Sequence, residues 1–394
     1  MTILNTTEED VGYIEEVTPG TTPSTPSLLA IPCVSASIKP VSAFAESDEM
    51  GVGGQVEDVL KTRESAMVSL DTCMRFPAVN SGILAIWENI MRSDIGTATS
   101  FTGTTISASA SGNTLDDSGD TAFANVVVGQ WIQVDGLVNG ANSGRHYVIA
   151  KADNGTVTVA TTLTNETAGN SVTIKGQMLR NGTTKHAGTF EEQKASNLFF
   201  YSRGTTLNTF NISISDQGVV KLKLEGPGME FGKGTSSLDA GGGYTQPGTK
   251  VIDANNGVID MRYDSFAADS SLEFNKCDIT LTSNTREIGA VRRTTLLGIG
   301  IGQFRGEASV DFFLEDGTLI GDFTAGTAKK FALHFEDPDG NQWVLTFLNC
   351  RITECTADAA GHSQEQFVKL KLTGIKETEL SLAATVQLDL FAAA

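Results

Sequence analysis

Apolar and polar residues alternate along much of the chain, which is the pattern of β-strands with one buried face. The clearest early example begins at Thr62. There Ala66, Val68 and Leu70 fall on one face of an extended segment, and Ser69 lies on the other. Similar alternation resumes over 189–226 and continues in the second half of the chain. Many glycines and few helical periods accompany it, so the sequence predicts a mainly β fold.

One segment departs from this pattern after Pro77. Ile83, Leu84, Trp87 and Ile90 recur at helical spacing, which predicts an amphipathic helix over 78–91. Aromatic residues on such a stripe usually pack in a core, and we expect the same of Trp87.

The composition changes at Ile95. Residues 96–182 are rich in Gly, Thr, Asn and Ser, and turn signals separate short strand patterns at 131–134, 147–150, 156–160 and 172–175. We interpret 96–182 as a small inserted all-β module without a helix. Its sharp boundaries predict that it protrudes from the rest and that its removal leaves assembly intact.

The strand patterns outside the module occur twice. Residues 220–226 and 368–374 match at six of seven positions, both containing Val-Lys-Leu-Lys-Leu. Upstream, 210–215 resembles 348–353, and 64–68 resembles 307–310. The unequal offsets, 138 and 148, place about ten extra residues in the second hairpin. Chance similarity of alternating strands is the alternative, but the conserved order favours two copies of one unit.

These patterns divide the chain as follows. Residues 1–37 form an N-terminal arm, 38–95 with 183–230 form copy 1, 96–182 form the module, 231–259 form a linker or assembly loop, and 260–394 form copy 2. Residues 1–30 and 227–257 contain few core-forming residues. We expect both to contact neighbouring subunits, although a frayed terminus explains the first equally well.

The charge restricts the partners. The 394 residues contain 28 Lys and Arg against 47 Asp and Glu, a formal charge of −19. Such a surface repels nucleic acid phosphates, which disfavours a protein that grips DNA or RNA but allows DNA to pass without adhering. No apolar run approaches the roughly 18 residues of a membrane helix, so no membrane insertion is expected. The odd number of cysteines, five, indicates reduced thiols.

Motifs for chemistry are weak. The four histidines are scattered, and the odd separation of Cys350 and Cys355 predicts opposite strand faces, which disfavours a shared metal. Gly298-x-Gly300-x-Gly302 lacks the Lys and Ser or Thr of a phosphate-binding loop. The acidic stretch 337–341 allows a calcium loop, but a hairpin turn explains it fully. We therefore predict no catalytic, cofactor-binding or metal-binding residues, and no enzyme.

The alternating segment at Glu64, the single helix and the later hairpin ending in Val-Lys-Leu-Lys-Leu-x-Gly resemble the major tail tube proteins of siphophages. The stretch 128–144, with its Val-Gly-Gln-Trp-Ile start, resembles an immunoglobulin-like β module that decorates such proteins. The resemblance implies tandem β-sandwich or barrel domains, each with a short flanking helix, that assemble into stacked rings around a DNA-conducting lumen. It implies no catalytic residue and no cofactor.

The resemblance also implies partners and a location. The partners are the chain itself, rings above and below, tape-measure, tail-terminator and baseplate proteins, and passing DNA without sequence-specific contact. The location is the virion tail, assembled in the bacterial cytoplasm. Two copies per chain favour a ring of three chains with approximate six-fold symmetry, with six chains as the alternative.

The polar sides of the repeated hairpins are the candidate surface for the lumen or an interface. Its residues are Asn211, Ser213, Lys221, Lys223, Arg351, Thr353, Lys369 and Lys371. A host-binding adhesin of the tail tip is the alternative function. Clustered exposed aromatic residues on the module would favour it.

Overall fold

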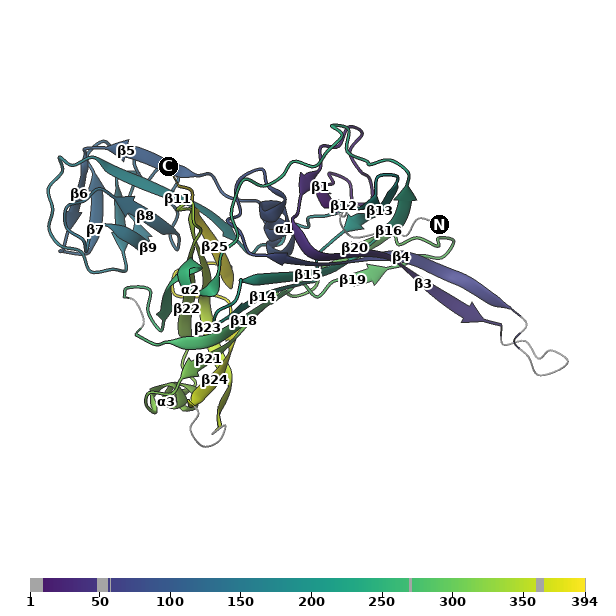
Figure 1. The fold of residues 1–394 in the computed structure, drawn as a ribbon. Helices are drawn as coiled ribbons and strands as arrows, with labels where there is room; N and C mark the ends of the chain where they lie inside the picture. Colours follow the sequence, from purple (N-terminus) through teal and green to yellow (C-terminus); the bar gives the residue numbers. More distant parts are fainter. Residues whose placement is uncertain (1–9, 48–55, 57, 269–270, 359–364, 394) are drawn as a thin grey trace.

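The computed structural model describes residues 10–47, 56, 58–268, 271–358 and 365–393 (Figure 1). Strands make up 52% of the chain and helices 6%, which confirms the predicted mainly β fold. The first nine residues of the predicted arm and residues 359–362 of the predicted second hairpin lie outside the described residues. Within the described residues, no helix is long and apolar enough to cross a membrane.

Copy 1 consists of two sheets and a helix, and each sheet takes strands from before and after the helix. Its elements are β1 (Asp10–Glu15), β2 (Leu29–Ala30), β3 (Cys33–Glu46), β4 (Val59–Cys73), α1 (Gly82–Met91), β12 (Gly188–Ala195), β13 (Leu198–Thr205), β14 (Thr209–Ser215), β15 (Lys221–Gly228) and β16 (Glu230–Gly234). The smaller sheet has the order β16-β13-β12-β1-β2.

The predicted arm and linker differ from the structure. β1 lies between β12 and β2, with Val11 and Tyr13 buried, and β16 pairs with β13. The backbone amide of Leu28 donates to Asp239 Oδ1 (2.8 Å), and that of Thr245 donates to the Leu28 carbonyl (2.9 Å). Residues 10–30 and 235–245 therefore support each other within one chain. The short Val11/Tyr13 alternation was hidden by the Pro-rich stretch that follows it.

Copy 2 repeats this plan in the second half of the chain. Its elements are α2 (Ala254–Gly257), β17 (Val258–Tyr263), β18 (Phe274–Thr282), β19 (Arg286–Ile288), β20 (Gly298–Gly300), β21 (Arg305–Phe313), α3 (Thr318–Ala325), β22 (Lys329–Glu336), β23 (Gln342–Asp358), β24 (Phe367–Gly374) and β25 (Val386–Phe391).

Five strand pairings of copy 1 have a counterpart in copy 2. In copy 1, β3 pairs with β4, β4 with β15, β15 with β14, β1 with β12, and β13 with β16. In copy 2, β18 pairs with β21, β21 with β24, β24 with the second half of β23, β17 with β22, and the first half of β23 with β25. The helices α1 and α3 follow β4 and β21, so they occupy the same place in the order.

The registers differ from the sequence alignment. Glu225 of β15 lies opposite Ser69, and its counterpart Thr373 lies opposite Glu307. Glu307 therefore corresponds to Ser69, five residues beyond the Glu64 that the sequence comparison matched to it. Register is set by which face is buried, and a short run of similar residues does not report that face.

The predicted helix is present but starts four residues later, at Gly82. Ser81 is its N-cap, and its hydroxyl accepts from the Leu84 amide (3.2 Å). The Ser81 amide donates to the Ala78 carbonyl (3.2 Å), so residues 78–81 form a turn before the helix. At the other end Arg92 is left-handed (φ 57°), which ends the helix.

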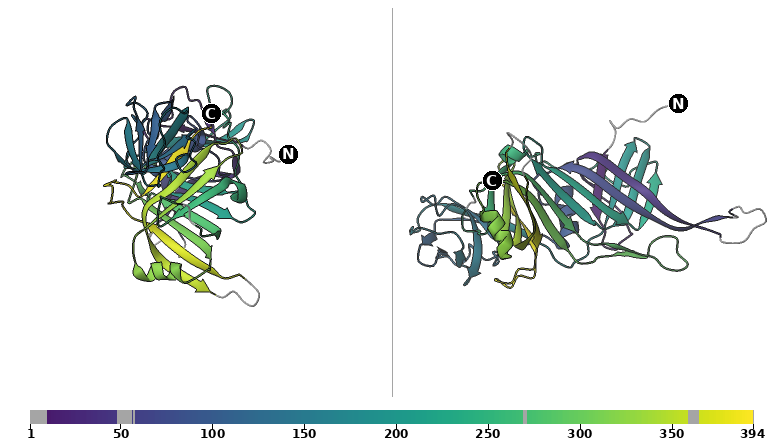
Figure 2. Two further views of the ribbon diagram at one scale, coloured as in Figure 1. Left: turned by 90° about the vertical axis from the view of Figure 1, so that its left-hand side faces the viewer. Right: turned by 90° about the horizontal axis from the view of Figure 1, so that it is seen from below.

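The two copies share one continuous antiparallel sheet. Its order is β3-β4-β15-β14-β18-β21-β24-β23-β22-β17, and the pairing of β14 with β18 joins copy 1 to copy 2. Figure 2 shows these strands side by side from the β3–β4 ribbon to the C-terminal half. One face carries the main core, in which Trp87 of α1 packs on Phe210 with ring centroids 4.6 Å apart.

The module has its own core but is not a free protrusion. Its strands are β5 (Thr99–Gly103), β6 (Ile106–Ser109), β7 (Thr114–Asp117), β8 (Trp131–Asp135), β9 (Gly144–Lys151), β10 (Thr156–Val159) and β11 (Val172–Arg180). β11 pairs with β5 and β8 over its first half and with β25 of copy 2 over its second. Trp131 and Tyr147 are buried in a separate cluster with Phe266, Val344 and Phe391 of copy 2. The module is thus inserted in copy 1 but docked on copy 2.

Candidate functional surface

The predicted surface residues lie on the face of the shared sheet that is opposite to the main core. Lys221 and Lys223 of β15 are exposed, and their neighbours Ser213 and Asn211 of β14 lie directly opposite them. The residues from β23 and β24 lie on the same face in copy 2. The structure therefore places the two groups on one face, separated by β18 and β21.

The strand registers arrange this face in rows that cross the sheet. One row crosses eight strands, and a parallel row crosses seven. The first contains Ser35, Asp71, Lys223, Asn211, Thr280, Glu307, Thr373 and Arg351. The second contains Cys73, Lys221, Ser213, Asp278, Ser309, Lys371 and Glu354.

Two shorter rows flank them, and the four rows together are called the polar face. One contains Ser37, Ser69, Glu225, Thr209, Thr282 and Arg305. The other contains Ser215, Lys276, Asp311, Lys369 and Thr356. The predicted Thr353 lies beside them, with its hydroxyl 3.1 Å from that of Thr373.

Sequence reasoning missed the middle of the polar face. β18 contributes Lys276 and Asp278, and β21 contributes Glu307 and Asp311. The signal was present, because charged or hydroxyl residues alternate with apolar ones over 276–282 and 307–312. These two strands contain no Val-Lys-Leu-Lys-Leu match, so the repeat alone did not draw attention to them.

Four of the five lysines of the polar face are paired with carboxylates, whereas Lys221 has Cys73 and Ser213 as its cross-strand neighbours. Lys223 Nζ lies 3.0 Å from Glu225 Oε1, and this contact raises the pKa of Lys223. Lys369 Nζ lies 3.8 Å from Asp311 Oδ1. Lys371 Nζ lies between two carboxylates, 3.6 Å from Glu354 and 3.8 Å from Glu307.

β18 adds a further pair. Lys276 Nζ lies 2.5 Å from Asp278 Oδ2, which raises the pKa of Lys276, and Ser213 donates to the other carboxylate oxygen (2.7 Å). Exposed pairs of this kind add little stability. Their consequence here is electrostatic, since these four lysines and Arg305 each have a carboxylate as a neighbour.

The polar face is nearly neutral, unlike the chain as a whole. Its four rows hold seven Lys and Arg and six Asp and Glu, a formal charge of +1 against −19 for the full sequence. The expectation that an acidic excess keeps DNA from adhering therefore does not apply to this face. Neighbouring charges of opposite sign present a weak field to a polyanion.

The prediction for Cys350 and Cys355 is wrong. A register shift between Ile352 and Glu354 inserts a β-bulge into β23. Because of the extra residue, Cys355 lies opposite Leu370 and faces the core, as Cys350 does. The described residues contain no group of three or more His, Cys, Asp and Glu that could hold an ion.

The stretch 337–341 is the predicted hairpin turn between β22 and β23. Asp337 Oδ1 accepts from the backbone amides of Asp339 and Asn341 (both 2.9 Å), and Oδ2 accepts from the Asn341 side chain (2.8 Å). The carboxylate is thus occupied in closing the turn.

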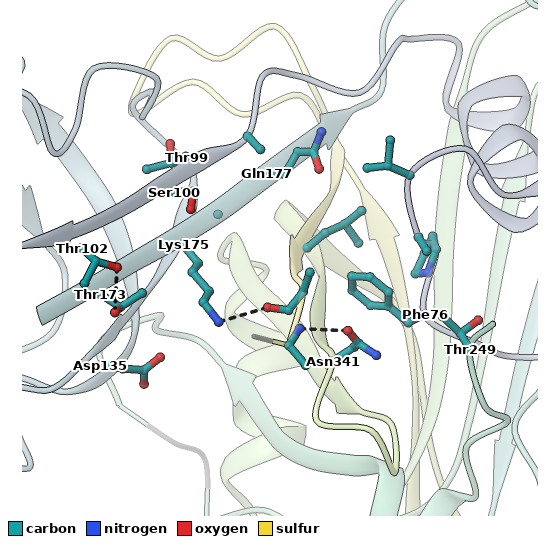
Figure 3. Close-up of a pocket in the computed structure, with 18 residues that line it drawn as sticks. Phe76, Thr99, Ser100, Thr102, Asp135, Thr173, Lys175, Gln177, Thr249 and Asn341 are labelled. Carbon is teal, nitrogen blue, oxygen red and sulfur yellow. Dashed lines mark hydrogen bonds between the residues drawn. The ribbon is translucent and has the colours of Figure 1, made fainter. Parts of the chain in front are cut away.

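A cleft of about 800 Å³ lies where the module, copy 1 and the C-terminal residues meet (Figure 3). Phe76 and Gln177 line it, and Lys175 on its wall donates to the carbonyl of Ala392 (3.2 Å). The described residues that line it include no histidine or cysteine, and the walls are mostly apolar or hydroxyl groups. This cleft follows from the docking of the module, and its wall includes a hydrogen bond between the hydroxyls of Thr102 and Thr173 (3.1 Å).

The β3–β4 hairpin extends beyond the sheet as a two-stranded ribbon (Figure 1). Phe44 is 61% exposed, Leu60 58% and Val59 51%. Residues on both faces of the ribbon are accessible from Ala43 onward. An isolated two-stranded ribbon with exposed apolar side chains is marginally stable in water, so the ribbon is a candidate contact surface.

No family model matches the chain, and no curated protein is significantly similar to it. The interpretation of this surface therefore rests on its geometry.

Proposed function

We propose that this chain is the structural subunit of a bacteriophage tail tube, and not an enzyme. In this proposal it assembles into stacked rings whose lumen conducts DNA into the host. The observation that carries the proposal is the polar face, a continuous surface built by both copies over one apolar core. The resemblance of the repeated hairpins to tail tube proteins gives the same assignment.

The polar face is suited to line a channel. Many of its side chains are short hydroxyl groups, and four of its five lysines, all except Lys221, are directed to a carboxylate of the same sheet. Lysines paired in this way neutralise few phosphates, so few counterions are released from the DNA and little affinity is gained. A polymer of high charge can then move along the face without being held.

The number of copies supports a ring of three chains. The two copies have corresponding strands, so each can occupy one position of a ring. A ring of six such copies then needs only three chains. The partners are then further rings, with tape-measure, tail-terminator and baseplate proteins at the ends, and the place of action is the virion tail.

The exposed ribbon is the proposed contact between stacked rings. We predict that the double variant Phe44→Ser, Val59→Ser assembles poorly, with the critical concentration raised at least about tenfold, because burying each apolar side chain contributes about 1.5–3 kcal/mol. The free energy of unfolding of the monomer should change by less than about 0.5 kcal/mol, since both side chains are exposed.

Sedimentation of assembled protein and denaturant unfolding measure the two effects. The matched control is Val138→Ser, which removes an 80% exposed apolar residue of the module. Equal assembly of the double variant and the control would exclude the ribbon from the ring contact.

Electron microscopy of the purified protein tests the function directly. We expect hollow tubes or rings, and a detached ring of about 125 kDa, three chains of 41.6 kDa each, by native mass spectrometry. Six chains would double that mass and contradict the three-chain ring. A protein that stays monomeric at high concentration and binds host cells would instead indicate a tail-tip adhesin.

A further inference from the structure

The contact between the two copies is itself a strand pairing. β14 of copy 1 and β18 of copy 2 pair antiparallel over seven residues, from Thr209 opposite Thr282 to Ser215 opposite Lys276. This pairing continues both the core and the polar face across the junction. It therefore shows how one unit of this fold attaches to the next.

Each partner in that pairing has a counterpart elsewhere in the chain. β14 and the second half of β23 each lie beside the Val-Lys-Leu-Lys-Leu strand of their own copy. In copy 1 Thr209 is opposite Glu225, and in copy 2 Arg351 is opposite Thr373, the residue equivalent to Glu225. β18 and β3 correspond in the same way, because both pair with the next strand of their unit, β21 and β4. The counterparts of the joined edges are thus residues 351–358 and β3.

Both counterparts have one unpaired side among the described residues. Residues 351–358 pair with β24 alone, and β3 pairs with β4 alone. On β3 the usable edge is short, since the Ile38 amide donates to Glu192 Oε2 (3.0 Å) and Pro40 has no amide hydrogen. Residues 33–37 remain available, and exposed edges of this kind pair readily with another chain.

We propose that residues 33–37 of one chain pair antiparallel with residues 354–357 of a second copy of this chain. The internal register fixes the pairs. Each internal pair has an equivalent between two chains. The pair Asn211–Thr280 becomes Glu354–Ser37, the pair Ile212–Ile279 becomes Cys355–Ala36, and the pair Ser213–Asp278 becomes Thr356–Ser35. This inference rests on the proposed function, for which it names the partner and the contact.

The faces of the two edges match in this register. Cys355 and Ala36 both pack against the main core, whereas Thr356 and Ser35 are both exposed on the polar face. The second row of the polar face ends at Glu354, and the proposed pairing continues it to Ser37 of the next chain. A shift by one residue would place core-facing residues opposite polar ones.

Each chain offers one edge of each kind, so the contact is head to tail. Such a contact closes into a ring when its rotation divides a full turn. Because it repeats the β14–β18 junction, every junction in the ring has the same form, and internal and intermolecular junctions alternate.

Cysteine pairing tests the register. One chain carries Ser35→Cys and the other Thr356→Cys, both exposed positions, and the two are mixed and oxidised. Opposed side chains in an antiparallel sheet place Cβ atoms about 4.5–5.5 Å apart, near the range of a disulfide. We expect a crosslinked dimer whose linked peptides contain residues 35 and 356. The control pair, Ser37→Cys with Thr356→Cys, is two residues out of register and should remain uncrosslinked.

A second variant keeps the fold and removes the edge. The Ala36 amide points the same way as that of Ile38, away from β4, so Ala36→Pro spares the β3–β4 hydrogen bonds. We expect this variant to unfold as the wild type does but to remain monomeric.

The outcomes separate the two proposals. Tubes that form without the 35–356 crosslink, or that form from Ala36→Pro, overturn the edge pairing and leave the tube function standing. Crosslinked oligomers that never extend into tubes support the edge pairing and overturn the tube function.

Discussion

Replacing Trp131 by alanine is expected to lower the free energy of unfolding by about 3–5 kcal/mol, the usual cost of removing a buried aromatic side chain. Trp131 is fully buried, and its ring lies 5.4 Å from that of Tyr147 and 5.5 Å from that of Phe266. Its indole nitrogen donates to Thr346 Oγ1 (3.0 Å), so the variant also leaves a buried hydroxyl unsatisfied.

The variant should release the module without unfolding it. The module core is a separate cluster that includes Phe123 and Val148 but not Trp131. Limited proteolysis should therefore liberate an intact fragment near residues 96–182. The matched control, Phe123→Ala, removes an equally buried aromatic residue from the module core and should cause digestion of the module itself. A Trp131→Ala protein with the wild-type unfolding midpoint would show that docking contributes nothing.

The same contacts reverse the expectation that the module is dispensable. Deletion of 96–182 would expose Phe266, Val344 and Phe391, which the module now covers, and would remove β11, one of the two strands that pair with β25. An exposed apolar patch next to an open strand edge promotes aggregation. The module is therefore expected to hold copy 2 in position.

The sequence predicted the parts of the fold that local patterns determine. The strand alternation at Val68, the helical stripe at Trp87 and the turn signals of the module all led to elements that the structure contains. The repeated Val-Lys-Leu-Lys-Leu strands occupy equivalent places beside β4 and β21. Each of these features depends on residues that are close in sequence.

What the sequence did not show depends on contacts between distant segments. The bulge near Thr353 is one extra residue, and no composition signal marks it, yet it reverses the face of Cys355. The docking of Trp131 on copy 2 needs partners more than 130 residues away, so its strand pattern alone could not distinguish a module core from an interface. The polar face required the registers of eight strands.

The junction between module and copy 2 also contains a carboxyl group that should make stability depend on pH. Asp389 of β25 is fully buried, which raises its pKa to about 8. Hydrogen bonds from Gln387 Nε2 (2.6 Å) and the Trp131 amide (3.2 Å), with the charge of Arg180, oppose this shift only in part.

The direction of the effect follows from proton binding. In the unfolded chain Asp389 loses its proton near its ordinary value of 3.8, whereas the folded chain keeps it until about pH 8. Between these values the folded state binds one more proton, so the stability contribution of Asp389 is present at low pH and is lost as pH rises towards 8. The loss is about 1.4 kcal/mol per pH unit.

Asp389→Asn removes this titration. The free energy of unfolding of the variant, minus that of the wild type, should therefore rise by about 1.4 kcal/mol per pH unit from pH 6 to 8 and level off above it. The buried His334, whose pKa lies well below the ordinary value, affects both proteins and cancels in the difference.

Denaturant unfolding at pH 6, 7, 8 and 9 measures how this difference in free energy depends on pH. Asp135→Asn, which removes an exposed carboxylate from the strand of Trp131, should give a flat difference. A flat difference for Asp389→Asn as well would mean that Asp389 is ionised throughout the range.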